Sequence, residues 1–115
     1  MPRDVRLYLF DILTEIAFVE SVITDQDATS YERNDLLRRA IERSLTIIGE
    51  AVVQIQAIDP ETDHGLPKTT ELRRFRNVLV HGYFALDHAR VFDLMLTELP
   101  PLKQAAQDRL ESLGQ

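Results

Sequence analysis

The fold is decided by one long stretch in the first half of the chain, Ser30-YERNDLLRRAIERSLTIIGEAVVQIQ-Ala57. Apolar side chains recur along this stretch at steps of three and four residues, at Leu37, Ile41, Leu45, Ile48, Val52 and Ile55. This spacing places them on one face of an α-helix. A helix over residues 30–57 would be about 40 Å long at 1.5 Å per residue. Because that is too long for a small globule, the stretch predicts an elongated helical bundle.

The segments on either side of this stretch also have helical patterns or clear breaks. Residues 3–24 predict an amphipathic helix, since apolar side chains recur at the same steps at Val5, Leu9, Ile12, Ile16, Val19 and Ile23. Thr29-Ser-Tyr-Glu32 is typical of a capping box and predicts the start of the helix over residues 30–57. Asp59-Pro60 predicts its end. Residues 59–68 include two prolines and a glycine and predict a loop.

The second half of the chain predicts shorter helices. Thr69 or Thr70 can cap a third helix, whose inward positions would be Leu72, Phe75, Val78, Leu79 and Gly82. Asp87 can cap a fourth, which carries the apolar residues Val91, Phe92, Met95 and Leu96. Pro100-Pro101 predicts a break before a short final helix over residues 102–113, ended by Gly114. We therefore expect a single all-α domain over residues 1–115: an up-and-down four-helix bundle with an additional short C-terminal helix.

Composition limits the classes of protein to which the chain can belong. Its 115 residues are 44% hydrophobic and 28% charged, as in soluble globular proteins. No apolar run approaches the ~20 residues of a membrane span, and the N-terminus lacks the apolar stretch of a signal peptide. We therefore expect a cytoplasmic protein with no membrane association. The absence of cysteine excludes a disulfide scaffold and a thiolate metal site. A net charge of -6 argues against a general nucleic-acid coat protein but allows a local basic site.

The segment Arg76-NVLVHG-Tyr83 places four polar groups in an otherwise apolar helical pattern. Histidine can exchange a proton near neutral pH, and arginine stays charged and holds phosphate oxygens with its planar fork. Together they suffice to cleave RNA without a metal. His81 would assist attack by the ribose 2′-hydroxyl, and Arg76 would stabilise the charge that builds on phosphorus. Asn77 could orient the imidazole or bind phosphate, and Tyr83 could stack, donate a hydrogen bond or be modified.

The spacing of this segment bears on the assembly of the site. Arg76 and His81 are five residues apart, which places them about 140° apart around a regular helix. Either the helix deforms near Gly82, or a second copy of the chain brings its own arginine and histidine across a two-fold axis. The second solution predicts a homodimer with the site at the subunit interface.

Each of these residues also has an ordinary structural role. A histidine near a helix end is often a surface or satisfied core residue, and a tyrosine after glycine often packs by its ring. Arg76 could pair with a carboxylate such as Glu71 or Asp87. Glu50 is a further candidate for holding a motif arginine. Gly49 before it costs about 1 kcal/mol in a helix relative to alanine, which close approach of another helix would offset.

Three further groups have weaker functional interpretations. Arg39 and Arg43 share a helix face and could guide an RNA backbone, or could form a solvated face paired with Glu42 or Glu50. The first helix has one acidic face, with Asp4, Asp11 and Glu15. A metal site there is conceivable, but no histidine accompanies it, so a solvated face or a docking surface for a basic partner is favoured. His64 lies in the predicted loop. His81 and His88 would belong to different helices, which disfavours a zinc site.

The pattern Arg76-x4-His81-x-Tyr83 resembles the signature of HEPN-domain ribonucleases, specifically the HepT-like toxins of prokaryotic toxin–antitoxin pairs. The polar residue after the arginine, Asn77, is also typical of them. The flanks from Phe75 to Phe84 and the segment Ile48-Gly-Glu-Ala51 are similar to the family as well.

The resemblance implies a HEPN-type helical bundle that forms a homodimer, or a higher oligomer, with the motifs at the interface. It implies a metal-independent endoribonuclease without a cofactor, in which Arg76 and His81 are catalytic and Asn77 supports them. It also implies the toxin role of a type VII-like pair, whose MntA-like nucleotidyltransferase antitoxin transfers AMP to Tyr83. The added phosphates would occupy the place of the RNA phosphate. The alternatives are a non-catalytic HEPN subunit of such a nucleotidyltransferase, and a structural dimerisation bundle.

Overall fold

The segments with a helical apolar pattern are helices in the computed structural model. The structure describes residues 4–58, 66–67, 73–74, 76–78 and 86–114. The helices are α1 (Val5–Ile23), α2 (Ala28–Arg33), α3 (Asp35–Ile58) and α5 (His88–Gly114). The short stretches 73–74 and 76–78 are also helical, and no strand occurs in the described ranges. The all-α class expected from the sequence is confirmed.

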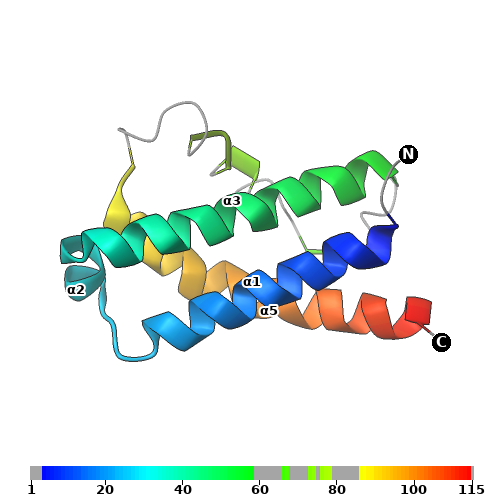
Figure 1. The fold of residues 1–115 in the computed structure, drawn as a ribbon, viewed down its shortest axis with the longest axis horizontal. Helices are drawn as coiled ribbons and strands as arrows, with labels where there is room; N and C mark the ends of the chain where they lie inside the picture. The colour runs from blue at the N-terminus through cyan, green and yellow to red at the C-terminus, as the bar shows by residue number, and fades with distance from the viewer. Residues whose placement is uncertain (1–3, 59–65, 68–72, 75, 79–85, 115) are drawn as a thin grey trace.

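The three long helices lie side by side in an elongated bundle (Figure 1), whose principal extents are 43 × 28 × 23 Å. The first helix, α1, packs against both α3 and α5 and runs in the opposite direction to both. The short α2 closes one end of the bundle and contacts α3 and α5 where these two helices begin. This elongated shape is the one predicted from the length of the helical pattern over residues 30–57.

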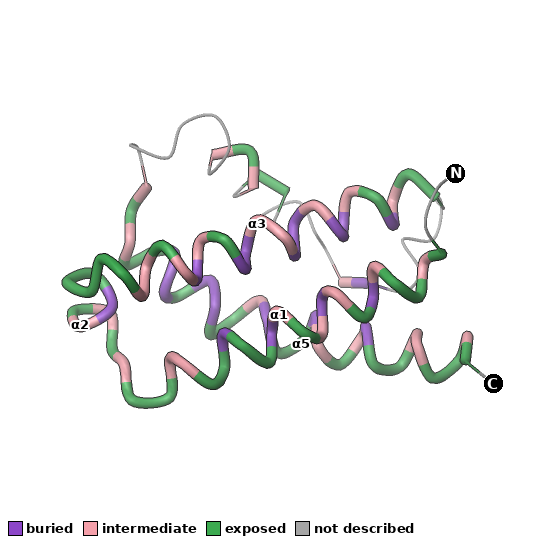
Figure 2. Tube along the Cα trace, in the orientation of Figure 1, coloured by how far each residue is buried: buried purple, intermediate pink, exposed green. Residues whose placement is uncertain are grey.

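The core lies between α1, α3 and α5 (Figure 2), on the faces that the periodicity predicts. From α1 the buried side chains are Leu9, Ile12, Ile16 and Val19, and from α3 they include Ile41, Leu45, Ile48, Val52 and Ile55. All nine are fully buried. Each such side chain stabilises the fold by about 1.5–3 kcal/mol relative to an exposed one. Leu37, also predicted to face inward, packs only partly buried against this core.

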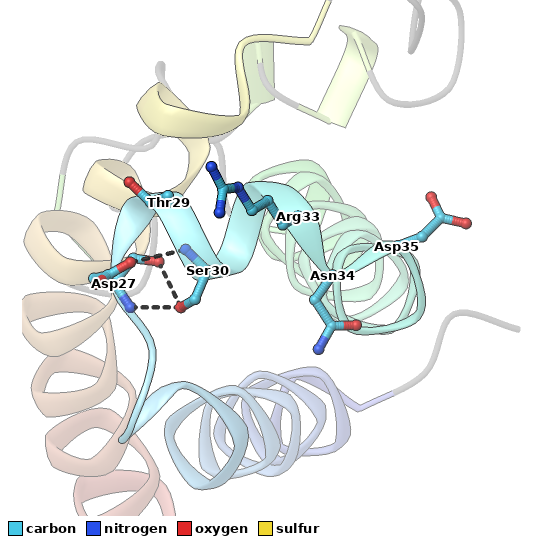
Figure 3. Close-up of a pocket in the computed structure, with 6 residues that line it drawn as sticks. All are labelled: Asp27, Thr29, Ser30, Arg33, Asn34 and Asp35. Carbon is cyan, nitrogen blue, oxygen red and sulfur yellow. Dashed lines mark hydrogen bonds between the residues drawn. The ribbon is translucent and has the colours of Figure 1, made fainter.

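The helix predicted over residues 30–57 is in fact two helices, and its predicted cap was wrong. The capping box of α2 uses Asp27 rather than Thr29 (Figure 3): the Ser30 amide donates to Asp27 Oδ1 at 2.8 Å, and the Asp27 amide donates to Ser30 Oγ at 3.0 Å. The chain leaves the helix at Asn34, with φ -101° and ψ 94°. The Leu37 amide then donates to Asn34 Oδ1 at 3.0 Å. Because an asparagine side chain can replace a backbone acceptor in this way, Asn34 ends one helix and caps the next.

The separate C-terminal helix predicted after the two prolines was also wrong. The cap at Asp87 is confirmed, since its Oδ1 accepts from the amides of Ala89 and Arg90 at 3.1 and 3.2 Å. However, α5 continues through Pro100 and Pro101 to its last residue. A proline inside a helix removes a backbone hydrogen bond and costs about 3 kcal/mol. Burial on both sides offsets this cost, because Leu99, Leu102 and Ala106 all pack into the core.

Parts of the predicted third helix and of the loop before it lie outside the described residues. The predicted caps Thr69 and Thr70 are among these, as is most of the loop over residues 59–68. The helical stretches at 73–74 and 76–78 fall within the predicted third helix. In the part of the chain that the structure describes, no helix is both long enough and apolar enough to cross a membrane.

Candidate functional site

The arginine of the motif is held against the middle of α3. Arg76 Nε donates to Glu50 Oε1 at 2.7 Å, and Arg76 Nη2 bonds to the same oxygen. On its other side, Arg76 Nη1 donates to Asn77 Oδ1 at 2.9 Å. The hypothesis that Glu50 holds an arginine of the motif is therefore confirmed. Asp87, one of the other carboxylates considered for this arginine, caps α5 instead.

Glu50 reaches Arg76 because of its position on α3. Its neighbours Ile48, Gly49 and Ala51 are buried, whereas the Glu50 side chain is 41% exposed. The carboxylate therefore stands at the edge of the core, where the helical stretch at 76–78 approaches α3. An ion pair this exposed adds only about 0–1 kcal/mol to stability. Its main effect is to fix the direction in which the guanidinium points.

The hydrogen bonds of Arg76 leave part of its guanidinium available. An arginine side chain has five N–H donors. Glu50 accepts from two nitrogens and Asn77 from a third, so three donors are used in the described contacts and two remain. The side chain is 24% exposed. A guanidinium whose orientation is fixed by a carboxylate, and which has two N–H groups that no described residue occupies, can bind the oxygens of a phosphate.

The structure brings Arg76 and Asn77 together through a hydrogen bond that the sequence did not predict, and the proposed roles of both residues stay predictions. His81 and Tyr83 lie outside the described residues, so their roles stay predictions. The same is true of His64 and of Glu71.

A second polar cluster joins α2, α3 and α5, and sequence reasoning did not find it. Arg38 Nη1 lies 3.1 Å from Nε2 of His88, and Arg38 Nη2 donates to Asp35 Oδ1 at 2.8 Å. Arginine can only donate, so Nε2 of His88 is the acceptor in this contact. The fully buried Tyr31 ring meets the His88 ring edge-on at 6.5 Å and lies 5.5 Å from the ring of Phe92.

Burial controls the ionisation of this cluster. It raises the pKa of the Tyr31 phenol, with a smaller contribution from the charge of Glu42. It also raises the pKa of Glu42, against the opposing effects of His88, Arg38 and Arg39. The Tyr31 hydroxyl has no hydrogen-bond partner among the described residues. Because Arg38 and His88 are 50 positions apart, no local pattern could have predicted their contact.

The acidic face of α1 does not form a metal site in the described structure. Asp4 caps α1 and pairs with Arg6 at 2.8 Å, and this hydrogen bond lowers the pKa of Asp4 to about 2. Glu20 binds Lys103 at 3.0 Å and so connects α1 to α5. Within the described ranges, no three histidine or acidic side chains gather closely enough to share a metal ion.

The two arginines on the outer face of α3 do not pair as the solvated-face interpretation expected. Arg39 Nε contacts Asp35 Oδ2 at 3.2 Å, rather than Glu42 or Glu50. The exposed Arg43 has no ion pair or hydrogen bond with any residue that the structure describes. Both arginines lie on the same helix as Glu50, but Glu50 pairs with Arg76 and with neither of them.

Comparison with known proteins assigns the chain that carries this site to a family. A family model described as "Ribonuclease HepT-like" matches residues 12–108, a range that contains both Glu50 and the whole motif. The chain belongs to the HepT-like ribonuclease family. The resemblance recognised from the motif and its flanks is thereby confirmed, and the bundle is of HEPN type.

Relatives of this HepT-like chain match it over almost its full length. "Putative RNase MJ0125" of Methanocaldococcus jannaschii is 31% identical over 98% of the chain and 97% of its own length. "Putative RNase MJ1380" of the same organism is 31% identical over 91% and 95% of the two chains. "Putative RNase TTE0752" of Caldanaerobacter subterraneus is 30% identical over 92% and 94%. No solved structure matches the chain.

Proposed function

We propose that this HepT-like chain is a metal-independent endoribonuclease whose site contains Arg76, Asn77 and His81. The observation that supports this most strongly is the Arg76–Glu50 contact. It holds the motif arginine at the surface of α3 with two N–H donors that no described residue occupies. The names of the relatives, which describe RNases, agree with RNA as the substrate.

The proposed reaction needs only a proton carrier and a phosphate-binding cation. His81 removes the proton of a ribose 2′-hydroxyl, and the resulting oxygen attacks the adjacent phosphorus. The bond from phosphorus to the 5′-oxygen breaks, and His81 returns the proton it has taken to that oxygen as it leaves. Arg76 binds the non-bridging oxygens, where negative charge builds during the attack. Asn77 keeps one edge of the guanidinium occupied and so supports its orientation. Glu50 acts as a positioning residue through Arg76.

We place this site at the interface of a homodimer. Support comes from the geometry of the motif, in which Arg76 and His81 are about 140° apart on a regular helix. A two-fold axis would bring the arginine of one subunit and the histidine of the other to the same phosphate.

The decisive assay is cleavage of RNA in the presence of EDTA by wild type and by His81→Ala. The proposal predicts cleavage by the wild type and loss of cleavage in the variant, because no other group in the site exchanges protons near neutral pH. Equal activity of the two proteins would contradict the assignment of His81. Absence of cleavage by a wild-type dimer shown by mass to be unmodified would contradict the endoribonuclease itself. The chain would then be better described as a non-catalytic subunit.

The proposed biological role is that of a toxin controlled at Tyr83. A nucleotidyltransferase antitoxin would add AMP to the phenol, which places negative charge and bulk beside Arg76 and His81 and blocks RNA. Co-expression with such a partner should increase the intact mass of the wild type by one or more AMP units. Tyr83→Phe should show no increase. An unchanged wild-type mass would argue against this mode of control.

A further inference from the structure

The outer face of α3 connects the site to two exposed arginines, Arg39, which pairs with Asp35, and Arg43, which has no partner among the described residues. Arg39 and Arg43 are four residues apart, and Glu50 follows seven residues after Arg43. Residues four and seven apart lie on the same face of a helix. At 1.5 Å per residue, Arg43 and Arg39 precede Glu50 by about 10 Å and about 16 Å along the helix axis. The guanidinium of Arg76 is attached to this face at Glu50.

From this arrangement we propose that Arg39 and Arg43 form a phosphate-binding track for single-stranded RNA that leads to Arg76. The proposal rests on the endoribonuclease function and adds to it a binding site for the strand beside the cleaved bond. A strand with one phosphate at Arg76 can continue along the face of α3 without folding back. Its backbone would then meet Arg43 first and Arg39 next.

The charges on this face support the track. Arg43 is exposed and, among the described residues, has no carboxylate partner, since Glu50 binds Arg76. Arg39 is 77% exposed and its partner Asp35 is 65% exposed. Such a surface pair is worth only about 0–1 kcal/mol, so a phosphate can replace Asp35 as the partner of Arg39. Arginine binds phosphate through paired N–H donors, which makes both residues suitable.

The overall charge of the protein favours a local basic site over general attraction of RNA. A chain with a net charge of -6 repels a polyanion at a distance, so affinity for RNA must come from local clusters of positive charge. Arg38, the other arginine in this part of α3, is bound to Asp35 and His88 and faces a different side of the helix. It is therefore not part of the proposed track.

The test measures binding of a single-stranded RNA made resistant to cleavage by 2′-O-methylation. The proteins compared are the wild type, Arg43→Ala and the double variant Arg39→Ala/Arg43→Ala. Arg6→Ala is the matched control, because it removes the same charge from an exposed arginine on α1. Affinity is measured between about 50 and 200 mM salt, where binding to phosphate is strongly salt-dependent. Circular dichroism confirms that each variant is folded.

The track predicts that Arg43→Ala weakens binding roughly tenfold at low salt, as expected for removal of a charged hydrogen bond. The slope of log affinity against log salt should become shallower by about 0.7 for each phosphate of a single strand that the variant no longer binds. The double variant should show about twice this change in slope, and Arg6→Ala should behave as wild type. If Arg43→Ala binds RNA no more weakly than Arg6→Ala, the track is overturned.

Failure of the track and failure of the ribonuclease proposal give different results. A wild type that binds the resistant RNA through Arg43 but does not cleave normal RNA contradicts only the catalytic proposal. A wild type that cleaves RNA while Arg43→Ala retains full affinity contradicts only the track.

Discussion

Two arginines at α3, Arg38 within the helix and Arg76 bound to its Glu50, are nearly equally buried but have different partners. The side chain of Arg38 is 20% exposed and that of Arg76 is 24% exposed. Arg38 is part of α3 and is enclosed by Asp35, His88 and the α2–α5 contact around Tyr31. Its Nε is buried without a partner in the described structure. Burial alone therefore does not separate the two arginines. Their partners do: Arg76 binds Glu50 and Asn77 at the edge of the core, and Arg38 binds Asp35 and His88 where three helices meet.

The comparison assigns different tasks to the two regions. The cluster around Arg38 joins three helices at one end of the bundle and should govern stability. The Arg76–Glu50 contact lies at the edge of the core, where removal of the ion pair should change stability little. It should instead change what the arginine can bind.

The largest expected effect on stability comes from Tyr31. Its ring is fully buried between α2 and α5 and contacts both His88 and Phe92. Tyr31→Ala should lower the free energy of unfolding by about 3–5 kcal/mol, as expected for a large aromatic side chain removed from a core. Urea denaturation followed by circular dichroism measures this change. Arg76→Ala, measured in parallel, should change it by no more than about 1 kcal/mol.

Tyr31→Phe separates the ring from its hydroxyl. The phenylalanine keeps the packing and removes a buried oxygen that has no described partner. A buried unpaired polar group destabilises a protein by about 1–3 kcal/mol, so this variant should be as stable as the wild type or more stable. A clear loss of stability in Tyr31→Phe would show that the hydroxyl stabilises the cluster and that the account of this region is wrong.

A smaller, pH-dependent effect is expected at Glu42. Burial raises the pKa of this carboxyl above its ordinary value of 4.5, so the folded protein holds the proton more tightly than the unfolded chain. Stability therefore falls as the pH rises from the unfolded value through the folded one. Glu42→Gln removes this loss. Its melting temperature should exceed that of the wild type at pH 7, and the difference should vanish near pH 4. A less stable variant at pH 7 would mean that attraction to Arg38 and His88 outweighs burial.

The helices and their core could be predicted because one periodic pattern determines both. The steps of three and four residues in α1 and α3 identified all nine of the fully buried side chains reported for these two helices. The helix ends were harder, because several residues near each break can act as caps. Asp27 and Asn34 cap α2 and α3 where the sequence also offered Thr29. The continuation of α5 through Pro100 could not be predicted from local helix propensity, because it depends on the burial of Leu99 and Leu102 in the core.

In the candidate site, only residues whose chemistry stands out within a local sequence pattern could be predicted. Arg76 and Asn77 stand in a recognisable motif, and Glu50 was identified because it follows a glycine in a helix. The contact between Arg38 and His88 corresponds to no local sequence motif, since it depends on how α3 and α5 are arranged. Arg43 could be identified as a candidate from the sequence. That it does not pair with Glu50 could not, because this depends on the contact between Glu50 and Arg76 in the folded protein.

The central claim is that Glu50 positions Arg76 for phosphate chemistry, and a double-mutant cycle on metal-free RNA cleavage tests it most directly. Arg76→Ala should reduce kcat by at least about 100-fold, as expected for removal of a group that stabilises transition-state charge. Glu50→Gln should reduce kcat by a smaller factor, with little change in the free energy of unfolding. Because Glu50 acts only through Arg76, the double variant should be no slower than Arg76→Ala. If the two losses multiply, or if Arg76→Ala cleaves RNA as fast as the wild type, the account is contradicted.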